Sequence, residues 1–267
     1  NGNLSNTELL ENEVIFEGDR LEPNYADVAG QWGAVWFLPG SNGNNIKNLT
    51  IKNATVGMLV SNNDGTPTPT IDMMNVQIYN CANVGILART GNMTGKNVVI
   101  NNCGQASLAC TYGGSYDFTH CTFANFWGSQ NQYCLIMSNN NINDSPNNFK
   151  NCIFYGSTNF GIGLEKFSGT LDYKFNNCLI KFVDTYNQFA TNPLYTFSDT
   201  SKYVGCIIAT NTTTNIPYFK NTTKNNFGIT ENSICINNAD NSFSTFVDIL
   251  GNSRATSSDI GAYEYLP

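Results

Sequence analysis

The chain carries little charge. Only 12% of its 267 residues are Asp, Glu, Lys or Arg, and the formal net charge is −7, with just three arginines. Proteins that bind nucleic acid neutralise phosphates with clustered Lys and Arg, so this composition argues against a nucleic-acid partner. No run approaches the roughly 18 apolar residues of a membrane span, and no signal peptide is visible. The sequence therefore predicts no transmembrane segment.

Residues that usually carry catalysis or hold metals are also scarce. His120 is the single histidine, and none of the nine cysteines stands in a CxxC or Cys/His spacing of the zinc-site type. We therefore expect no metal site and no cofactor. Ca²⁺ would enter only if the chain were a polysaccharide lyase, because such an enzyme must neutralise a uronate carboxylate.

Asparagine, in contrast, fills about one position in six, and much of it belongs to a repeat. Seven times a polar residue, nearly always Asn, is flanked by apolar residues at −2, +1 and +3. This slot is filled in turn by Asn48, Asn75, Asn97, His120, Asn151, Asn177 and Gly205. Successive slots are 27, 22, 23, 31, 26 and 28 residues apart. A constant phrase with variable spacers is typical of a β-solenoid, whose coils share short strands but differ in their outer loops.

The columns around the slot predict side-chain directions. We expect positions −2, +1 and +3 to point inward and the mostly polar position −1 to face water, as the two-residue strand period requires. Positions −2 and +1 are three residues apart, so the chain must bend at the slot. Asn and Gly readily adopt the left-handed backbone of such a bend, and stacked Asn side chains can hydrogen-bond as a ladder. His120 is accordingly interpreted as a bend residue.

Four cysteines share one inward column, at the +1 position of successive coils: Cys121, Cys152, Cys178 and Cys206. We expect them to form a buried, reduced ladder of small apolar side chains. Cys81 and Cys103 share another column, and neighbouring coils lie about 4.8 Å apart. A disulfide between these two is sterically conceivable, and the sequence leaves that alternative open.

A further strand phrase follows each slot after nine or ten residues, as in Gly57–Val60, Gly85–Ala88 and Gly161–Leu164. Three short strands per coil resemble the right-handed parallel β-helix, the pectate-lyase-like superfold, over roughly Val14 to Ile208; the handedness is implied by that resemblance. We expect an all-β fold with a single domain over 1–267 and about nine or ten coils. It would comprise N-terminal coils in 1–43, regular coils in 44–210 and an irregular capping segment in 211–267.

A narrower resemblance rests on three stretches. They are EGDRLEPNYADVAGQWGAVWFLPGS from Glu17, IKNLTIKNATVG from Ile46 and SDIGAYEY from Ser258. Together they resemble exported β-helix proteins of gut Bacteroidetes, in which the last phrase is of the "choice-of-anchor" type. The resemblance implies export to the cell surface, periplasm or medium, and a final strand at Asp259–Tyr265 packed on the last coil. Because Asn1 opens in strand-like sequence without an initiator Met, we expect that an export signal or further coils precede it.

A search for catalytic groups favours a non-catalytic function. In pectate-lyase-like enzymes the groove runs over the strand placed here at Gly57, Gly85 and Gly161, and the outward residues of that strand are mostly small and apolar. Asp64 and Glu165 would lie near 19 Å apart, at about 4.8 Å per coil, which is too far for the carboxyl pair of a glycosidase. The leading hypothesis is a non-catalytic module that binds glycan or acts as a rigid spacer. The alternatives are a polysaccharide lyase or glycoside hydrolase, and a surface adhesion or assembly protein.

Two surfaces are candidates for binding. Arg89 and Glu165 end groove strands on the outward side, and Tyr112 and Trp127 lie in neighbouring loops, so we predict that these four contact a glycan. The outward position at +2 of the slot turns apolar toward the C-terminal half, and we expect this strip to be covered by a protein partner. The strip consists of Val99, Ile153, Leu179 and Ile207.

Overall fold

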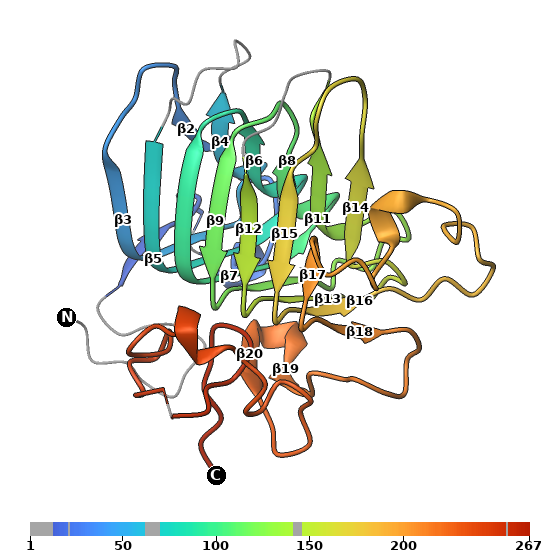
Figure 1. Ribbon diagram of the computed structural model, residues 1–267. Coiled ribbons are helices and arrows are strands. Elements are labelled where there is room, and N and C mark those ends of the chain that lie inside the picture. The colour runs from blue at the N-terminus through green and yellow to red at the C-terminus, as the bar shows by residue number, and fades with distance from the viewer. Residues whose placement is uncertain (1–12, 21, 62–69, 141–145, 255) are drawn as a thin grey trace.

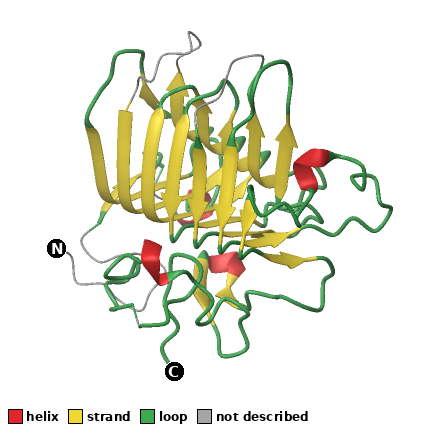
Figure 2. Ribbon diagram, in the orientation of Figure 1, coloured by secondary structure: helices red, strands yellow, loops and turns green. Residues whose placement is uncertain are grey.

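The structure is a computed structural model that describes residues 13–20, 22–61, 70–140, 146–254 and 256–267, and its dominant feature is a parallel β-solenoid (Figures 1 and 2). Its coils form three faces. Face 1 contains the first halves of β3 (Asn44–Lys52), β5 (Thr70–Cys81) and β7 (Asn92–Cys103), then β9 (Ser115–Thr119), β12 (Asn147–Lys150), β15 (Tyr173–Asn176) and β17 (Tyr203–Val204). The three longest strands continue around a corner into face 2.

Face 2 contains β1 (Val14–Phe16), the second halves of β3, β5 and β7, then β10 (Thr122–Asn125), β13 (Ile153–Gly156), β16 (Leu179–Lys181) and β18 (Ile207–Ala209). Face 3 contains β2 (Val35–Phe37), β4 (Val56–Ser61), β6 (Val84–Arg89), β8 (Ala106–Cys110), β11 (Tyr133–Ser138) and β14 (Ile162–Glu165). Outside the solenoid sheets lie the antiparallel pair β19 (Phe219–Asn221) and β20 (Asn226–Ile229), and the short 3₁₀ helices η1 (Pro23–Tyr25), η2 (Pro193–Tyr195), η3 (Thr222–Lys224) and η4 (Asn241–Phe243).

The expected fold class is confirmed, but the expected number of coils is too high. Face 3 contains six strands, one for each turn of the chain, so the solenoid has about six turns rather than nine or ten. The described residues before 44 contribute only β1 and β2 to the sheets. Residues 211–267 add no coil, because their strands pair only with each other.

The bend at the slot is confirmed in every coil. All seven slot residues have left-handed backbone, with φ between 48° at Asn177 and 59° at Gly205. Asn75 Nδ2 donates to Asn48 Oδ1 and Asn97 Nδ2 to Asn75 Oδ1, both at 3.1 Å, as the predicted ladder requires. A second ladder, which was not predicted from the sequence, runs through Asn53, Asn80 and Asn102 and turns the chain from face 2 to face 3.

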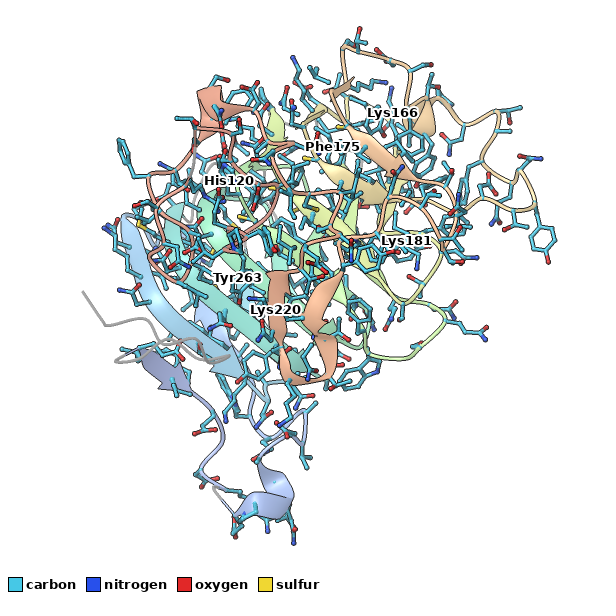
Figure 3. All side chains as sticks on the ribbon, turned by 90° about the horizontal axis from the view of Figure 1, so that it is seen from below. His120, Lys166, Phe175, Lys181, Lys220 and Tyr263 are labelled. Atoms are coloured by element: carbon cyan, nitrogen blue, oxygen red, sulfur yellow. The ribbon has the colours of Figure 1, made fainter. Side chains whose placement is uncertain are left out.

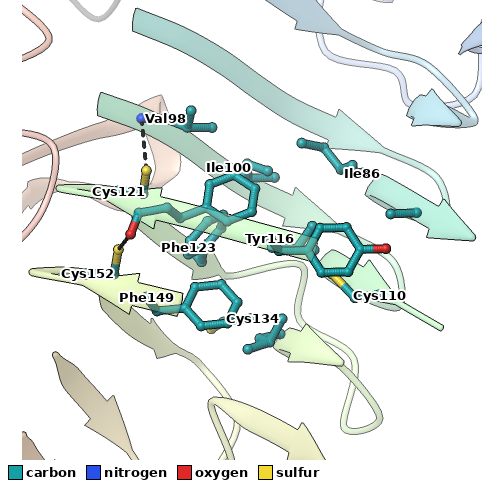
Figure 4. Close-up of a cluster of buried hydrophobic side chains, with 14 of the residues drawn as sticks. Ile86, Val98, Ile100, Cys110, Tyr116, Cys121, Phe123, Cys134, Phe149 and Cys152 are labelled. Carbon is teal, nitrogen blue, oxygen red and sulfur yellow. Dashed lines mark hydrogen bonds between the residues drawn. The ribbon is translucent and has the colours of Figure 1, made fainter. Parts of the chain in front are cut away.

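The inward columns form one continuous core. Phe118, Phe149, Phe175 and Tyr203 stack on successive coils, with ring centroids 5.8, 5.2 and 5.5 Å apart. The predicted cysteine column is buried as well, except for a partly exposed Cys206, and all nine cysteines are free thiols. Figure 4 shows Cys121 and Cys152 of this column beside the core residues Phe123 and Phe149. Burial raises the pKa of the Cys121 and Cys178 thiols, so these groups stay protonated.

The C-terminal end of the solenoid is covered by a loop that sequence reasoning did not single out. Between β16 and β17 the chain brings Phe189, Tyr195 and Phe197 against Phe182, with centroid distances of 5.5, 4.7 and 5.1 Å. The hydroxyl of Tyr195 also accepts a hydrogen bond from the backbone N–H of Leu164, on the last strand of face 3, at 2.7 Å. Aromatic side chains between residues 182 and 203 therefore cover this end of the solenoid.

Residues 211–267 lie along the side of the solenoid, across face 2 (Figure 3). Their buried side chains pack on several coils at once, from Val99 on β7 to Leu179 on β16. The apolar strip expected to meet a protein partner is thus covered by the chain itself: Val99 is 3% exposed, Ile153 1% and Leu179 0%, and Ile207 is half-buried. That prediction was wrong because a local pattern cannot distinguish an internal partner from an external one.

The phrase Asp259–Tyr265 is not a strand, and its backbone hydrogen bonds to the solenoid reach the middle coils rather than the last one. The backbone N–H of Gly261 donates to Asn151 O at 2.8 Å, and that of Ala262 donates to Thr122 Oγ1 at 3.1 Å. Both partners belong to the middle coils. The phrase therefore attaches the C-terminal segment to the centre of face 2.

Candidate functional site

A groove lies between the outer side of face 1 and a loop of the C-terminal segment, residues 242–247. Its volume is about 630 Å³, within the range usual for ligand sites. The floor comes from β5, β7, β9 and β12, and the wall comes from Phe243, Phe246 and their neighbours. We call it the face 1 groove.

Strand register places the polar floor residues in two rows along the solenoid. Asp72 pairs with Thr94, and Thr94 with Asp117, so these three side chains follow one another on adjacent coils. The second row contains Met74, Lys96, Thr119 and Lys150. Outward side chains alternate with inward ones along each strand, which explains why both rows lie on the outer side of the strands while the inward column between them belongs to the core.

The charges of the floor are balanced. Lys150 Nζ lies 2.9 and 2.7 Å from the two carboxylate oxygens of Asp117, and it also lies 5.5 Å from the centre of the Phe243 ring. The hydroxyl of Thr94 donates to Asp72. Lys96 is exposed beside them. The floor therefore offers charged donors and acceptors without a strong excess of either sign.

The aromatic wall is held in place by the bend ladder. Asn151 Oδ1 accepts from the backbone N–H of Asp240 at 2.8 Å, and Asp240 caps η4, which carries Phe243. Asn97 Nδ2 donates to Val247 O at 3.0 Å. The slot residues thus also anchor the two ends of the loop. Phe246, between these anchors, is 97% exposed.

A buried ion pair also stabilises the position of the C-terminal segment against the coils. The guanidinium of Arg254, whose side chain is 0% exposed, lies 3.0 Å from Glu264 Oε2 and donates to Asn97 Oδ1 at 3.2 Å and Gly261 O at 2.9 Å. Burial lowers the pKa of Arg254, while the nearby carboxylates of Glu264 and Asp248 raise it. This group joins the C-terminal segment to the coil ladder.

His120 is enclosed by the same interface (Figure 3). Its Nε2 lies 3.0 Å from Asn151 Nδ2, so the ring replaces an amide in the ladder. Burial, together with the smaller effect of the positive charge of Arg254, lowers the pKa of His120 to about 3. The ring is neutral at physiological pH and lies under the segment, which agrees with its interpretation as a bend residue rather than a catalytic base.

The four residues predicted to contact a glycan do not form one cluster. Arg89, at the end of β6, lies 6.0 Å from the ring of Tyr112. Glu165 ends β14 on the same face, but β8 and β11 separate it from β6. Trp127 lies in the turn before β11, at the opposite end of the face 3 strands. Contact of these residues with a ligand stays a prediction, and Asp64 lies outside the described residues.

Sequence reasoning missed the face 1 groove. The row of Asp72, Thr94 and Asp117 was visible as a polar column three residues before each slot, but only the column next to the slot was weighed. Phe243 and Phe246 belong to no repeat, and their position depends on contacts with coils about 90 to 150 residues earlier. No sequence signal indicated that wall.

No protein-family model matches the chain, and no curated protein matches it significantly. Within the described residues, no group of three or more His, Cys, Asp or Glu side chains is placed to hold a metal ion. The described part of the chain also contains no helix long and apolar enough to cross a membrane.

Proposed function

We propose that the protein is an exported or cell-surface β-solenoid that binds glycan without cleaving it. The observation that supports this most directly is the exposed Phe246 ring, which lines the same groove as the charged floor residues Asp72 and Lys96. Sugar rings stack their apolar faces on aromatic rings, while their hydroxyls hydrogen-bond to charged and amide groups. Support for export comes from the resemblance of the Ser258–Tyr265 phrase to exported β-helix proteins.

The direction of the groove favours an extended ligand. The rows of Asp72, Thr94 and Asp117 follow the solenoid axis, with steps of about 4.8 Å from coil to coil. An oligosaccharide can contact successive coils with successive sugar units. The balanced floor charges favour a glycan with little net charge over a polyanion, for which a row of unpaired cations would be needed.

The test is a glycan array followed by calorimetry on the strongest ligand. Phe246→Ala is expected to weaken binding about tenfold or more, because it removes the stacking ring. Lys96→Ala is expected to weaken binding by a smaller factor. Tyr186→Ala is the matched control, since Tyr186 is another highly exposed aromatic residue, 88% exposed, and it lies outside the groove. Binding that is unchanged by both groove variants would reject this site.

Hydrolysis is a second candidate, favoured by one feature of the floor. Asp72 and Asp117 share a row and are separated by one coil, which places their backbones roughly 9 to 10 Å apart. The two carboxyl groups of inverting glycosidases lie about 6.5 to 9.5 Å apart. Lys150 forms an ion pair with Asp117, which weighs against a catalytic role for that carboxylate. Release of reducing ends from an array ligand, abolished by both Asp72→Asn and Asp117→Asn, would establish hydrolysis and refute the non-catalytic proposal.

A further inference from the structure

The corner between faces 2 and 3 is built differently in different coils. Between β5 and β6 and between β7 and β8 the chain turns with two residues, 82–83 and 104–105. The same corner takes seven residues, 126–132, between β10 and β11, and five, 157–161, between β13 and β14. Two residues are enough to connect the strands, so the corner itself does not require the additional residues. Loop residues beyond what a scaffold needs are often the ones that bind ligands.

The two long turns enclose a hollow of about 440 Å³, which we call the corner hollow. Its lining is rich in hydroxyl and amide groups, such as those of Ser129, Gln130, Thr158 and Asn159, and contains no charged residue. Two aromatic rings, Tyr133 and Phe160, complete it. Phe160 is fixed from behind by Phe182 and Phe189, with ring centroids 4.9 and 5.1 Å away.

One buried acceptor in this lining is unsatisfied. Gln132 is 1% exposed, and its Oε1 accepts no hydrogen bond from the described residues. The rest of the residue is held firmly: Nε2 donates to Asn125 O at 3.3 Å and to Ser157 Oγ, and the backbone O accepts from Thr158 Oγ1 at 2.9 Å. An unpaired buried acceptor is unfavourable because it has lost its hydrogen bond to water, and a donor brought by a ligand would restore a hydrogen bond.

We propose that the corner hollow binds a single neutral sugar ring, at a site separate from the face 1 groove. Its hydroxyls would meet the side-chain amides and hydroxyls, one of them donating toward Gln132, and an apolar face of the ring would lie on an aromatic side chain. A charged sugar is disfavoured because the lining offers no counter-charge for a desolvated carboxylate or ammonium group. The inference does not depend on the proposed function, since the two sites share no lining residue.

Trp127 can report on ligand binding in the corner hollow, because it immediately precedes Gly128, which lines the hollow. Protein labelled with 5-fluorotryptophan has three fluorine resonances, and the Trp127→Phe variant assigns the one of interest. The probes are the methyl glycosides of glucose, galactose and mannose and free N-acetylglucosamine, with glucuronate and glucosamine as charged counterparts. We expect at least one neutral probe to shift the Trp127 resonance saturably, and neither charged probe to do so.

Variants decide whether the shift reports the hollow. Gln130→Ala combined with Asn159→Ala is expected to weaken the neutral probe about tenfold, whereas Asn83→Ala, in the short turn of another coil, should leave the affinity within about twofold. Phe246→Ala should leave the Trp127 response intact even if glycan binding in the groove is lost, so the two proposals fail separately. The absence of any saturable shift, an equal response to charged probes, or an unchanged affinity in the double variant would each overturn the inference.

Discussion

The coil body and the C-terminal segment are stabilised in different ways. In the coils one structural solution recurs: the same left-handed bend appears seven times, and four aromatic rings stack in one column. In residues 211–267 the polar contacts that hold the segment on face 2 occur once each, such as those of Arg254 with Glu264 and Asn97. The coil body thus spreads its stability over equivalent positions, and the segment concentrates it in a few.

This difference has a functional consequence. The coil body supplies a floor of polar rows at fixed spacing, and the segment supplies the single aromatic wall of the face 1 groove. In a solenoid each coil is stabilised mainly by its neighbours, so a substitution that destabilises one coil also destabilises the coils stacked on it. A destabilising substitution in the C-terminal segment should act locally and change the face 1 groove first.

The largest effect is expected from Phe149→Ala. Phe149 is fully buried and stacks between Phe118 and Phe175, so its removal leaves a cavity in the middle of the column. We expect the free energy of unfolding to fall by about 3–5 kcal/mol, measured by chemical denaturation. Lys47→Ala, on the exposed side of β3, should change it little. Similar losses in the two variants would contradict the inward and outward assignment.

The next effect is expected from Arg254→Leu, and it should be local. The change removes the guanidinium from a carboxylate, Glu264, that stays buried, which typically costs about 3–5 kcal/mol. Hydrogen exchange should accelerate in residues 211–267 while the inward strands of the coils stay protected. Replacing both partners, Arg254→Met with Glu264→Met, should restore much of the protection. Equal acceleration throughout the coils would show that the segment is part of the same cooperative unit.

Much of the coil body could be predicted from the sequence because its pattern recurs. Three apolar columns and a polar slot indicated the core, the corner and the direction of Asn75 and its equivalents, and each repetition strengthened the interpretation. The end cap at 182–203 and the path of 211–267 could not be predicted, since their contacts are used once. Arg254 and Asn97, for example, are 157 residues apart, and no spacing rule connects them.

The candidate site likewise has one part that could be predicted from the sequence and one part that could not. The row of Asp72, Thr94 and Asp117 was present in the sequence as a repeating column and could have been found there. Phe246 could not, because its place above the floor depends on the path of the C-terminal segment. Arg89, at the end of β6, and Tyr112, after β8, lie on adjacent coils of face 3, and contact of either residue with a ligand stays a prediction.

The junction between the two regions should respond to pH through His120. Burial and Arg254 lower the pKa of His120 to about 3, below the 6.5 of an exposed histidine. Below pH 6.5 the unfolded chain binds a proton that the folded chain does not, so stability falls as the pH drops from 6.5 toward 3. Relative to His120→Asn, the wild type should lose about 2–3 kcal/mol between pH 7 and 4.5. Denaturation of both proteins at the two pH values measures this.

Comparing the wild type with His120→Asn separates the pH dependence caused by His120 from that caused by the carboxyl groups around it. Asp259, whose pKa is raised mainly by burial, contributes an opposite pH dependence, but it is present in both proteins and cancels from the difference. Asn is the residue that most slots contain, so the variant keeps the bend. Parallel pH profiles for the two proteins would show that the buried ring is not held neutral.

The smallest expected effect separates backbone geometry from the ladder. Asn75 in the coil body and Asn237 in the C-terminal segment have nearly the same left-handed backbone, with φ of 55° and 56°. Only Asn75 also forms side-chain hydrogen bonds with the slot residues before and after it.

Alanine at either position carries the left-handed strain of about 1 kcal/mol, and glycine avoids it. We therefore expect Asn237→Ala to lower the free energy of unfolding by about 1 kcal/mol and Asn75→Ala by about 2 kcal/mol. Asn75→Gly should fall between Asn75→Ala and the wild type, because it keeps the bend and loses the ladder. If Asn75→Gly were as stable as the wild type, the ladder would contribute nothing, and the slot would select asparagine for its backbone alone.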